Sequence, residues 1–444
     1  MRKEKLLAVM LFLSLVAEND TVLAYYHEMW TPARLFEWFT VPLPIKLNVF
    51  QMALVLMLLI YRRKSPAAKP IARAIWVSMA SLLFCVLYGL ARGGVLKPIY
   101  TQVSAWLTCL VFALTAMTTL TTVEDFRRLE NAIVWAGVWR SCMAAIFYMK
   151  VRGRDWTTMP PHMTTHEDTV LFVVALIVLV SRAIELRTRS SLRTLFVSAP
   201  LILIAIQVNN RRLAWASLVA GLLVLYFMLP AKSKVTRKVN RSLLRISPVL
   251  VLYVAIGWGR PEKIFKPLQS FSSMGGGQVD NSTKARDNEN LSLITMIREQ
   301  PLFGTGLGHE WNELDATYTV PISVFPLYHY CPHNSVLALL AFCGGVGVAG
   351  LWMIIPVSVF LNARTYRRSP NAAERSVALV GIVEVVVYLN QAYGDMGAMG
   401  VTHIGPATIL GAGIACAAKL SVSSGAWPSP TTGRASVHPN HERS

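Results

Sequence analysis

Long apolar runs, separated by short polar or basic segments, cover most of this sequence. Of its 444 residues, 54% are hydrophobic and only 15% are charged, whereas soluble domains carry about 25% charged residues. A run of about 20 apolar residues crosses a bilayer as a helix. Inside the bilayer, only a helix or a closed barrel can satisfy the backbone hydrogen bonds. The sequence therefore predicts an all-α polytopic membrane protein.

We expect twelve membrane spans, which is consistent with a single membrane domain over residues 1–420. The Ser- and Pro-rich residues 421–444 are predicted to form a disordered tail. The expected spans lie near 5–24, 43–61, 70–91, 98–119, 129–149, 168–186, 192–209, 212–229, 245–259, 333–360, 376–393 and 400–418.

The basic residues predict the orientation of these spans. The chain carries 43 Lys and Arg against 24 Asp and Glu, a net charge of +19. With the N-terminus in the cytoplasm, 27 of the basic residues fall on the cytoplasmic side and 15 on the outer side, while Arg140 lies within a span. This bias follows the positive-inside rule. It places both termini in the cytoplasm, and anionic lipid explains the charge without a nucleic-acid partner.

One large loop, residues 260–332, is expected on the outer side. Loops longer than about 15 residues are usually functional or disordered. The loop begins with a polar, flexible segment, and residues 289–299 read as a short amphipathic helix that ends before Pro301. The loop then continues as a Gly-rich segment with glycines at 304, 306 and 308, which permit tight turns and positive φ angles.

His333 follows this segment at the outer end of a long apolar helix. On a continuous helix, Gly344 would lie about 20° from His333 around the axis, and Gly347 about 40° on the other side. We therefore expect an imidazole above a face of small residues. An imidazole exchanges a proton near neutral pH, so His333 is a candidate catalytic base. The alternative is an ordinary interfacial residue, with Asn334 as the helix cap.

Two adjacent arginines, Arg211 and Arg212, open a span from the outer side, against the charge bias. Guanidinium groups at a helix N-terminus suit a phosphate or diphosphate. The alternative is a pair that reaches to lipid headgroups. Arg286 lies in the large loop near Asp280 and Asp287, where local sequence favours a solvated charge.

Further candidates for substrate contact are His166, Asp168, His309, Glu310 and Asn334. Their spacing matches no standard metal motif, so we expect hydrogen bonds to sugar and no metal site. Glu384 falls within a span and either is functional or pairs with Arg140.

Several of these patterns together resemble a known family. His333 and Asn334, followed by Gly344 and Gly347, resemble the motif of bacterial O-antigen ligases and O-antigen polymerases. The resemblance extends to residues 301–308, to the Arg-Arg-Leu-Ala-Trp run at 211–215 and to residues 282–286. Many relatives carry an aromatic residue four positions after the loop arginine, where this chain has Asn290.

The resemblance implies an inverting, metal-independent glycosyltransferase of the membrane-embedded, GT-C-like type that needs no cofactor. The donor would be a glycan on undecaprenyl diphosphate at the periplasmic face of the bacterial inner membrane. The acceptor would be a glycan or glycolipid. Arg211, Arg212 and Arg286 would bind the diphosphate. His333 would activate the acceptor hydroxyl, with ligase and polymerase activity both open. The alternative from another class is a transporter or flippase of a lipid-linked glycan.

Overall fold

The computed structural model describes residues 3–17, 49–61, 66–151, 162–231, 233–260, 281–315, 327–395 and 404–428, with a few single positions between them. This part of the chain is helical and contains no strand. The helices are α1 (Lys3–Ala17), α4 (Val49–Ile60), α5 (Lys69–Ala91), α6 (Leu96–Thr119), α7 (Val123–Val151), α8 (Asp168–Glu185), α9 (Arg189–Asn209), α10 (Arg212–Met228), α11 (Lys234–Gly257), α13 (Asn281–Glu299), α14 (Ser335–Trp352), α15 (Ile354–Arg368), α16 (Ala372–Gly394) and α17 (Ile404–Ser423).

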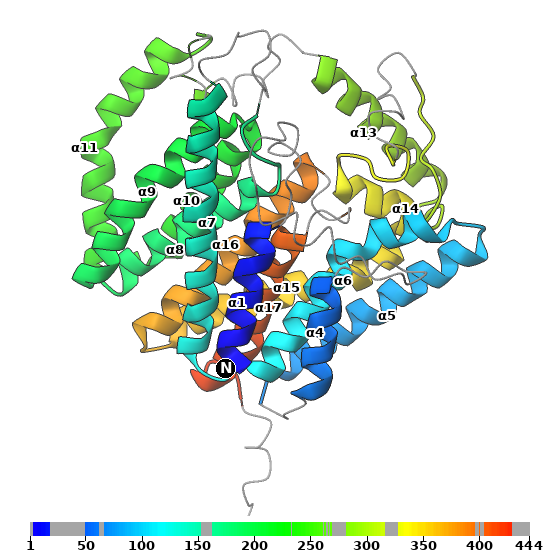
Figure 1. Ribbon diagram of the computed structural model, residues 1–444, viewed down its shortest axis with the longest axis horizontal. Helices are drawn as coiled ribbons and strands as arrows, with labels where there is room; N and C mark the ends of the chain where they lie inside the picture. Colours follow the sequence, from blue (N-terminus) through cyan, green and yellow to red (C-terminus); the bar gives the residue numbers. More distant parts are fainter. Residues whose placement is uncertain are drawn as a thin grey trace, which may run out of the picture.

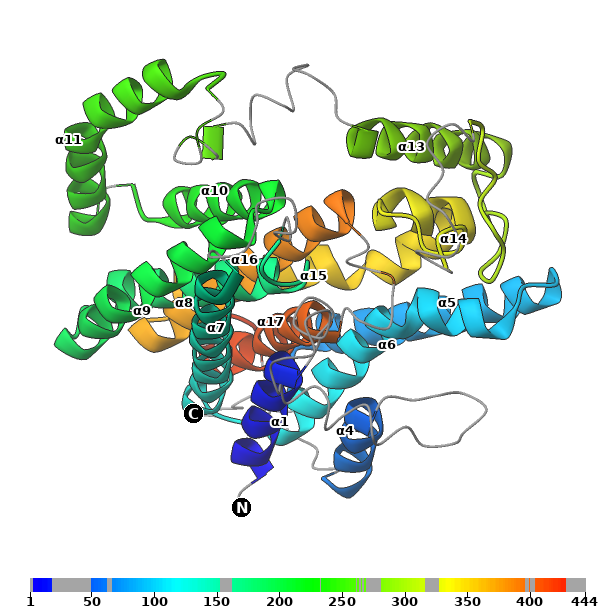
Figure 2. The same cartoon turned by 45° about the horizontal axis from the view of Figure 1, so that its top comes forward.

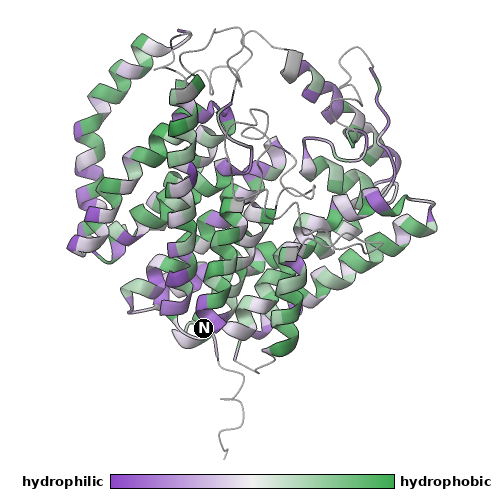
Figure 3. Cartoon of the chain, viewed as in Figure 1, coloured by the Kyte–Doolittle hydropathy of each residue, from purple (hydrophilic) through white to green (hydrophobic). Residues whose placement is uncertain are grey.

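The predicted all-α membrane fold is confirmed. Seven helical stretches of the described residues are long and apolar enough to cross a membrane, with α14 and α15 counted together. Figure 3 shows hydrophobic residues along most of the bundle and hydrophilic ones on much of α13. The total of twelve spans stays a prediction, because residues 18–48 and other segments lie outside the described part.

Helix α17 forms the centre of the bundle, where it packs against α6, α15 and α16 (Figure 2). Its residues 404–421 are all buried. A Cβ atom on Gly411 would lie 2.8 Å from the carbonyl oxygen of Cys109 on α6. Small residues therefore let the helices of this core approach closely, as is typical of membrane bundles.

The helix that follows His333 is broken at Gly344, which has φ 64° and ψ 177°. The expectation of a continuous helix with Gly344 and Gly347 on the face below His333 is therefore wrong. A break exposes backbone donors and acceptors that a membrane cannot hydrate, so another part of the protein has to satisfy them.

The Gly-rich segment supplies those partners. Thr305 and Gly306 donate backbone hydrogen bonds of 2.9 Å to the carbonyls of Ala341 and Phe342. On the other side of the break, Gly345 and Val346 donate bonds of 2.8 and 3.1 Å to the carbonyls of residues 301 and 302. The loop and the broken helix therefore form one hydrogen-bonded unit.

Gly304 explains part of the glycine pattern in this unit. Its φ is 69°, and a Cβ atom would lie 2.5 Å from the carbonyl oxygen of Ala341. The segment can fill the break only because its backbone approaches the helix without a side chain between them.

Two other boundaries differ from the sequence prediction. Helix α13 begins at Asn281 and not at residue 289, so Asp287 lies on a helix and not in a flexible loop. Figure 1 shows α13 at the top of the molecule, at the end away from the N-terminus, and it packs along α14. Helix α17 continues to Ser423, past the expected start of the tail. Residues 429–444 lie outside the described part.

Replacement of Gly344 should destabilise the fold more than replacement of its neighbour. Ala at 344 would need a positive φ, and its Cβ would lie 2.3 Å from the carbonyl oxygen of Leu302. We expect Gly344→Ala to lower the free energy of unfolding by roughly 1–3 kcal/mol. Gly345→Ala is the control, because its Cβ would meet only the carbonyl oxygen of Pro301, at 3.4 Å. Unfolding in mixed micelles measures both, and equal losses would contradict the prediction.

Candidate functional site

Arg211, Arg286 and His333 lie where the N-terminal ends of α10 and α14, the C-terminal end of α16 and α13 meet. Arg286 on α13 donates a 3.2 Å hydrogen bond to the carbonyl of Gly394 at the end of α16. Ser335, the first residue of α14, donates a 3.2 Å bond to the backbone oxygen of Asp395. The large loop and the membrane helices therefore share one polar site.

His333 is paired with a buried carboxylate on α13. The Glu289 side chain is 1% exposed, and its Oε2 lies 3.0 Å from His333 Nδ1. Its Oε1 accepts a 3.2 Å bond from the backbone N–H of Asn334. A carboxylate at Nδ1 holds the imidazole proton on that atom. Nε2 then carries the free lone pair, on a side chain that is 25% exposed.

Asn334 caps α14, as one interpretation of the sequence predicted. Its Oδ1 accepts a 3.2 Å bond from the Leu337 backbone N–H. Its Nδ2 donates a 3.0 Å bond to Asn290 Oδ1. Asn290, which replaces the aromatic residue of many relatives, therefore joins α13 to the start of α14. These bonds fix the turn that carries His333.

Arg211 is the N-cap residue of α10 and follows Asn210, which has a left-handed φ of 62°. Its Nη1 lies 2.6 Å from His166 Nε2. The other ring nitrogen of His166 faces the carboxylate of Asp395. The chain Arg211–His166–Asp395 therefore orients the guanidinium, and we assign His166 to positioning Arg211.

The electrostatic environment of Arg211 favours an anion. Burial lowers the pKa of its guanidinium to about 10, so it stays cationic at neutral pH. Asp395 and Glu167 raise this pKa, whereas the charge of Arg286 lowers it. The two guanidiniums are therefore close enough to repel each other.

One donor of Arg211 has no partner in the described structure. Its Nε is buried and makes no hydrogen bond to any described residue. Buried donors are almost always paired, so this N–H is available to a ligand oxygen. Arg212, the first residue of α10, is exposed beside it. A negatively charged ligand would relieve the repulsion and satisfy the donor.

Asp168 is committed to another partner. Its carboxylate binds Arg140 through two hydrogen bonds, of 2.9 and 2.7 Å, and both side chains are 4% exposed. The pair joins α7 to the start of α8, directly below His166. The alternative in which Arg140 pairs with Glu384 is therefore wrong, and we assign Asp168 to supporting the site.

His309 holds the Gly-rich segment against the end of α5. Its ring nitrogens lie 3.1 Å from the carbonyl oxygens of Gly306 and Arg92. Glu310, the next residue, is exposed. Within the described ranges, no group of three His, Cys, Asp or Glu side chains is placed to hold a metal ion.

Residues 169–352 match the family model described as O-antigen ligase. The match includes Arg211, Arg286, Glu289 and His333. This part of the chain is therefore similar to an O-antigen ligase domain. This similarity supports an assignment to the family that ligates or polymerises glycans. No curated protein matches it.

The structure adds two residues to the candidate site that sequence reasoning missed, Glu289 and Asp395. Glu289 lies three positions after Arg286, which places both on neighbouring faces of α13. If the sequence had predicted a helix from residue 281, the spacing of Arg286 and Glu289 would have shown that they lie on neighbouring faces of it. Asp395 lies just past the end of α16 and showed no signal in the sequence.

Removal of Arg140 should destabilise the protein strongly, because it leaves the Asp168 charge buried without its partner. We expect Arg140→Gln to lower the free energy of unfolding by about 3–5 kcal/mol. The double variant Arg140→Met/Asp168→Leu should recover most of this loss, because no buried charge remains. Unfolding in mixed micelles provides the measurement.

The control is Arg127→Gln, which removes an exposed pair with Glu124 on the same helix. Such surface pairs contribute about 0–1 kcal/mol. If Arg140→Gln cost no more than this control, the pair would not stabilise the site.

Proposed function

We propose that the protein transfers a glycan from a lipid diphosphate to a hydroxyl of an acceptor glycan or glycolipid, with inversion at the anomeric carbon. The donor fits undecaprenyl diphosphate at the periplasmic face of a bacterial inner membrane. The observation that carries the proposal is the contact of His333 with the buried Glu289, which lies on the same helix as Arg286 and near Arg211. This arrangement places a proton acceptor, His333, close to a site for an anion.

The proposed base acts on the acceptor hydroxyl, and the leaving group is the diphosphate on the donor sugar. The acceptor hydroxyl gives its proton to Nε2 of His333 while its oxygen forms a bond to the anomeric carbon. The bond from that carbon to the diphosphate oxygen breaks, and the electron pair leaves with the diphosphate. Glu289 stabilises the imidazolium that forms, which is the role of the carboxylate in other His-based sites.

The arginines supply the charge that such a leaving group needs. Arg211 and Arg286 surround the anion site, and Arg212 extends it towards the exposed end of α10. The α10 N-terminus adds partial positive charge. Electrostatic stabilisation of developing charge commonly contributes more to catalysis than any other single effect. Arginine also grips phosphate oxygens in a two-pronged geometry that lysine cannot reproduce.

Orientation supports the periplasmic assignment. Helix α13 and the start of α14 lie at the end of the bundle opposite the N-terminus (Figure 1). The Lys and Arg bias of the short loops favours a cytoplasmic N-terminus. A lipid-linked donor in the outer leaflet would then present its diphosphate at the level of Arg211.

The test is transfer by purified protein given lipid-diphosphate glycan and an acceptor. We expect Glu289→Gln and His333→Ala each to reduce kcat by about 10²-fold or more, because the first removes the carboxylate that stabilises the protonated base and the second removes the base itself. Asp287→Asn is the matched control, because Asp287 is exposed on the same helix two residues away. Product on a gel or by mass spectrometry gives the rates.

Full activity of Glu289→Gln would show that the Glu289 carboxylate has no role in the mechanism. Movement of the donor across vesicles without any glycosidic product would instead support a transporter of lipid-linked glycans.

Transfer should also continue without divalent metal. A diphosphate can be neutralised by a metal ion or by fixed cations, and this site offers three arginines. We expect equal rates in EDTA and in magnesium, measured with the same purified assay. Loss of transfer in EDTA that added Mg²⁺ or Mn²⁺ restores would contradict the arginine mechanism and would point to the carboxylates and histidines near His309.

A further inference from the structure

A basic cavity lies at the end of α15, at the opposite end of the bundle from His333. Its volume is about 310 Å³, and its lining residues are Phe360, Ala363, Arg364, Arg367 and Arg368. Sites for small molecules commonly measure about 300–1,000 Å³. Arg367 and Arg368 are exposed, and the mechanism proposed above uses none of the three arginines.

The residues of this cavity are ordered along the helix by polarity. Three of the lining residues lie four and three positions apart in the sequence, so they share one face of α15: Phe360, Arg364 and Arg367. Phe360 lies about 6 Å closer to the bundle centre than Arg364 along the axis. It is 53% exposed. The cavity therefore has an apolar inner part and a cationic outer part.

Trp427 places the outer part at the membrane surface. The Arg364 guanidinium lies 5.2 Å from the centroid of the Trp427 ring, and its Nε donates to the Ala426 carbonyl. The Trp427 ring also meets Phe360 edge-on, with centroids 6.4 Å apart. Tryptophan is enriched at the level of lipid headgroups. The three arginines therefore stand at headgroup level.

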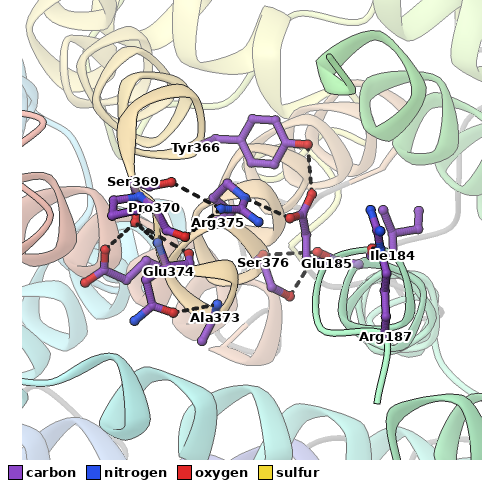
Figure 4. Close-up of polar contacts among 12 residues, drawn as sticks. Ile184, Glu185, Arg187, Tyr366, Ser369, Pro370, Ala373, Glu374, Arg375 and Ser376 are labelled. Carbon is purple, nitrogen blue, oxygen red and sulfur yellow. Dashed lines mark hydrogen bonds and ion pairs between the residues drawn. The ribbon is translucent and has the colours of Figure 1, made fainter. Parts of the chain in front are cut away.

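The nearby carboxylates are already engaged elsewhere. Glu185 accepts hydrogen bonds from Tyr366 and Arg375, of 3.0 and 2.8 Å, and Glu374 accepts one from Ser369. Figure 4 shows this network between α8, α15 and α16. Within the described ranges, no carboxylate lies within salt-bridge distance of Arg364, Arg367 or Arg368. Three cations therefore share about one turn of helix without a counter-charge from the described residues.

We propose that this cavity binds the headgroup of an anionic phospholipid in the leaflet opposite the His333 site. The phosphate would lie among the three arginines, and an acyl chain would cover Phe360. Basic pockets between membrane helices bind lipid headgroups in this way. A soluble phosphate would use the arginines but would leave Phe360 uncovered, so the amphipathic order of the cavity favours a lipid.

Native mass spectrometry of the full-length protein tests the proposal with phosphatidylglycerol as the probe. Phosphatidylethanolamine with the same acyl chains and inorganic phosphate serve as comparisons. We expect the anionic lipid to bind about tenfold more tightly than the zwitterionic one. Arg367→Gln/Arg368→Gln should abolish this preference, and Phe360→Ala should weaken lipid binding.

The matched control is Arg237→Gln/Arg241→Gln, which removes two exposed charges from α11. It should leave the affinity within about twofold, because these charges lie outside the cavity. Equal losses in both double variants would overturn the proposal in favour of diffuse attraction. Displacement of the lipid by inorganic phosphate would overturn it in favour of a soluble anion.

A second measurement needs no variant. Phosphatidylglycerol with a photoreactive acyl chain should label the peptide that contains Phe360 in the wild-type protein. Labelling confined to other helices would overturn the proposal, whatever the stability of the variants.

Discussion

The arrangement of the site depends on the backbone hydrogen bonds across the break in α14. A helix interrupted within a membrane protein leaves donors and acceptors that water cannot satisfy. Here residues 301–306 satisfy them, and Gly344 and Gly304 make the approach sterically possible. Because this segment connects α13 to the start of α14, the repair of the helix also fixes where the large loop lies. The position of His333 therefore follows from a backbone constraint about ten residues away.

A second constraint is the pairing of polar side chains around that scaffold. Arg140 neutralises Asp168, Glu289 holds His333, and Asp395 acts on Arg211 through His166. Each pair joins two helices, so the polar side chains set the relative positions of the helices as well as their own. The buried Nε of Arg211 is different, because no described residue satisfies it. The site combines side chains that have fixed partners with one donor that stays available.

The sequence predicted those features that depend on local pattern. Apolar runs gave the membrane helices, and the position of Arg211 and Arg212 gave the start of α10. The break at Gly344 could not be predicted, because a helical projection assumes regular dihedral angles. The hydropathy of the sequence also does not depend on whether a residue has a positive φ. Glu289 was missed for a different reason. Its role needs the long-range docking of α13 on α14, and the polar first turns of α13 read as a flexible loop.

Helix α13 carries Arg286 and Glu289 one turn apart, so one rigid body holds a part of the anion site and the carboxylate that orients the base. In the proposed reaction, a displacement of this helix would weaken leaving-group departure and acceptor activation in the same movement. The two halves of the reaction are then mechanically coupled. Water that reached a donor while α13 was displaced would find neither a base nor a complete set of cations. In the proposed reaction, the connectivity of the chain would thereby disfavour hydrolysis of the donor.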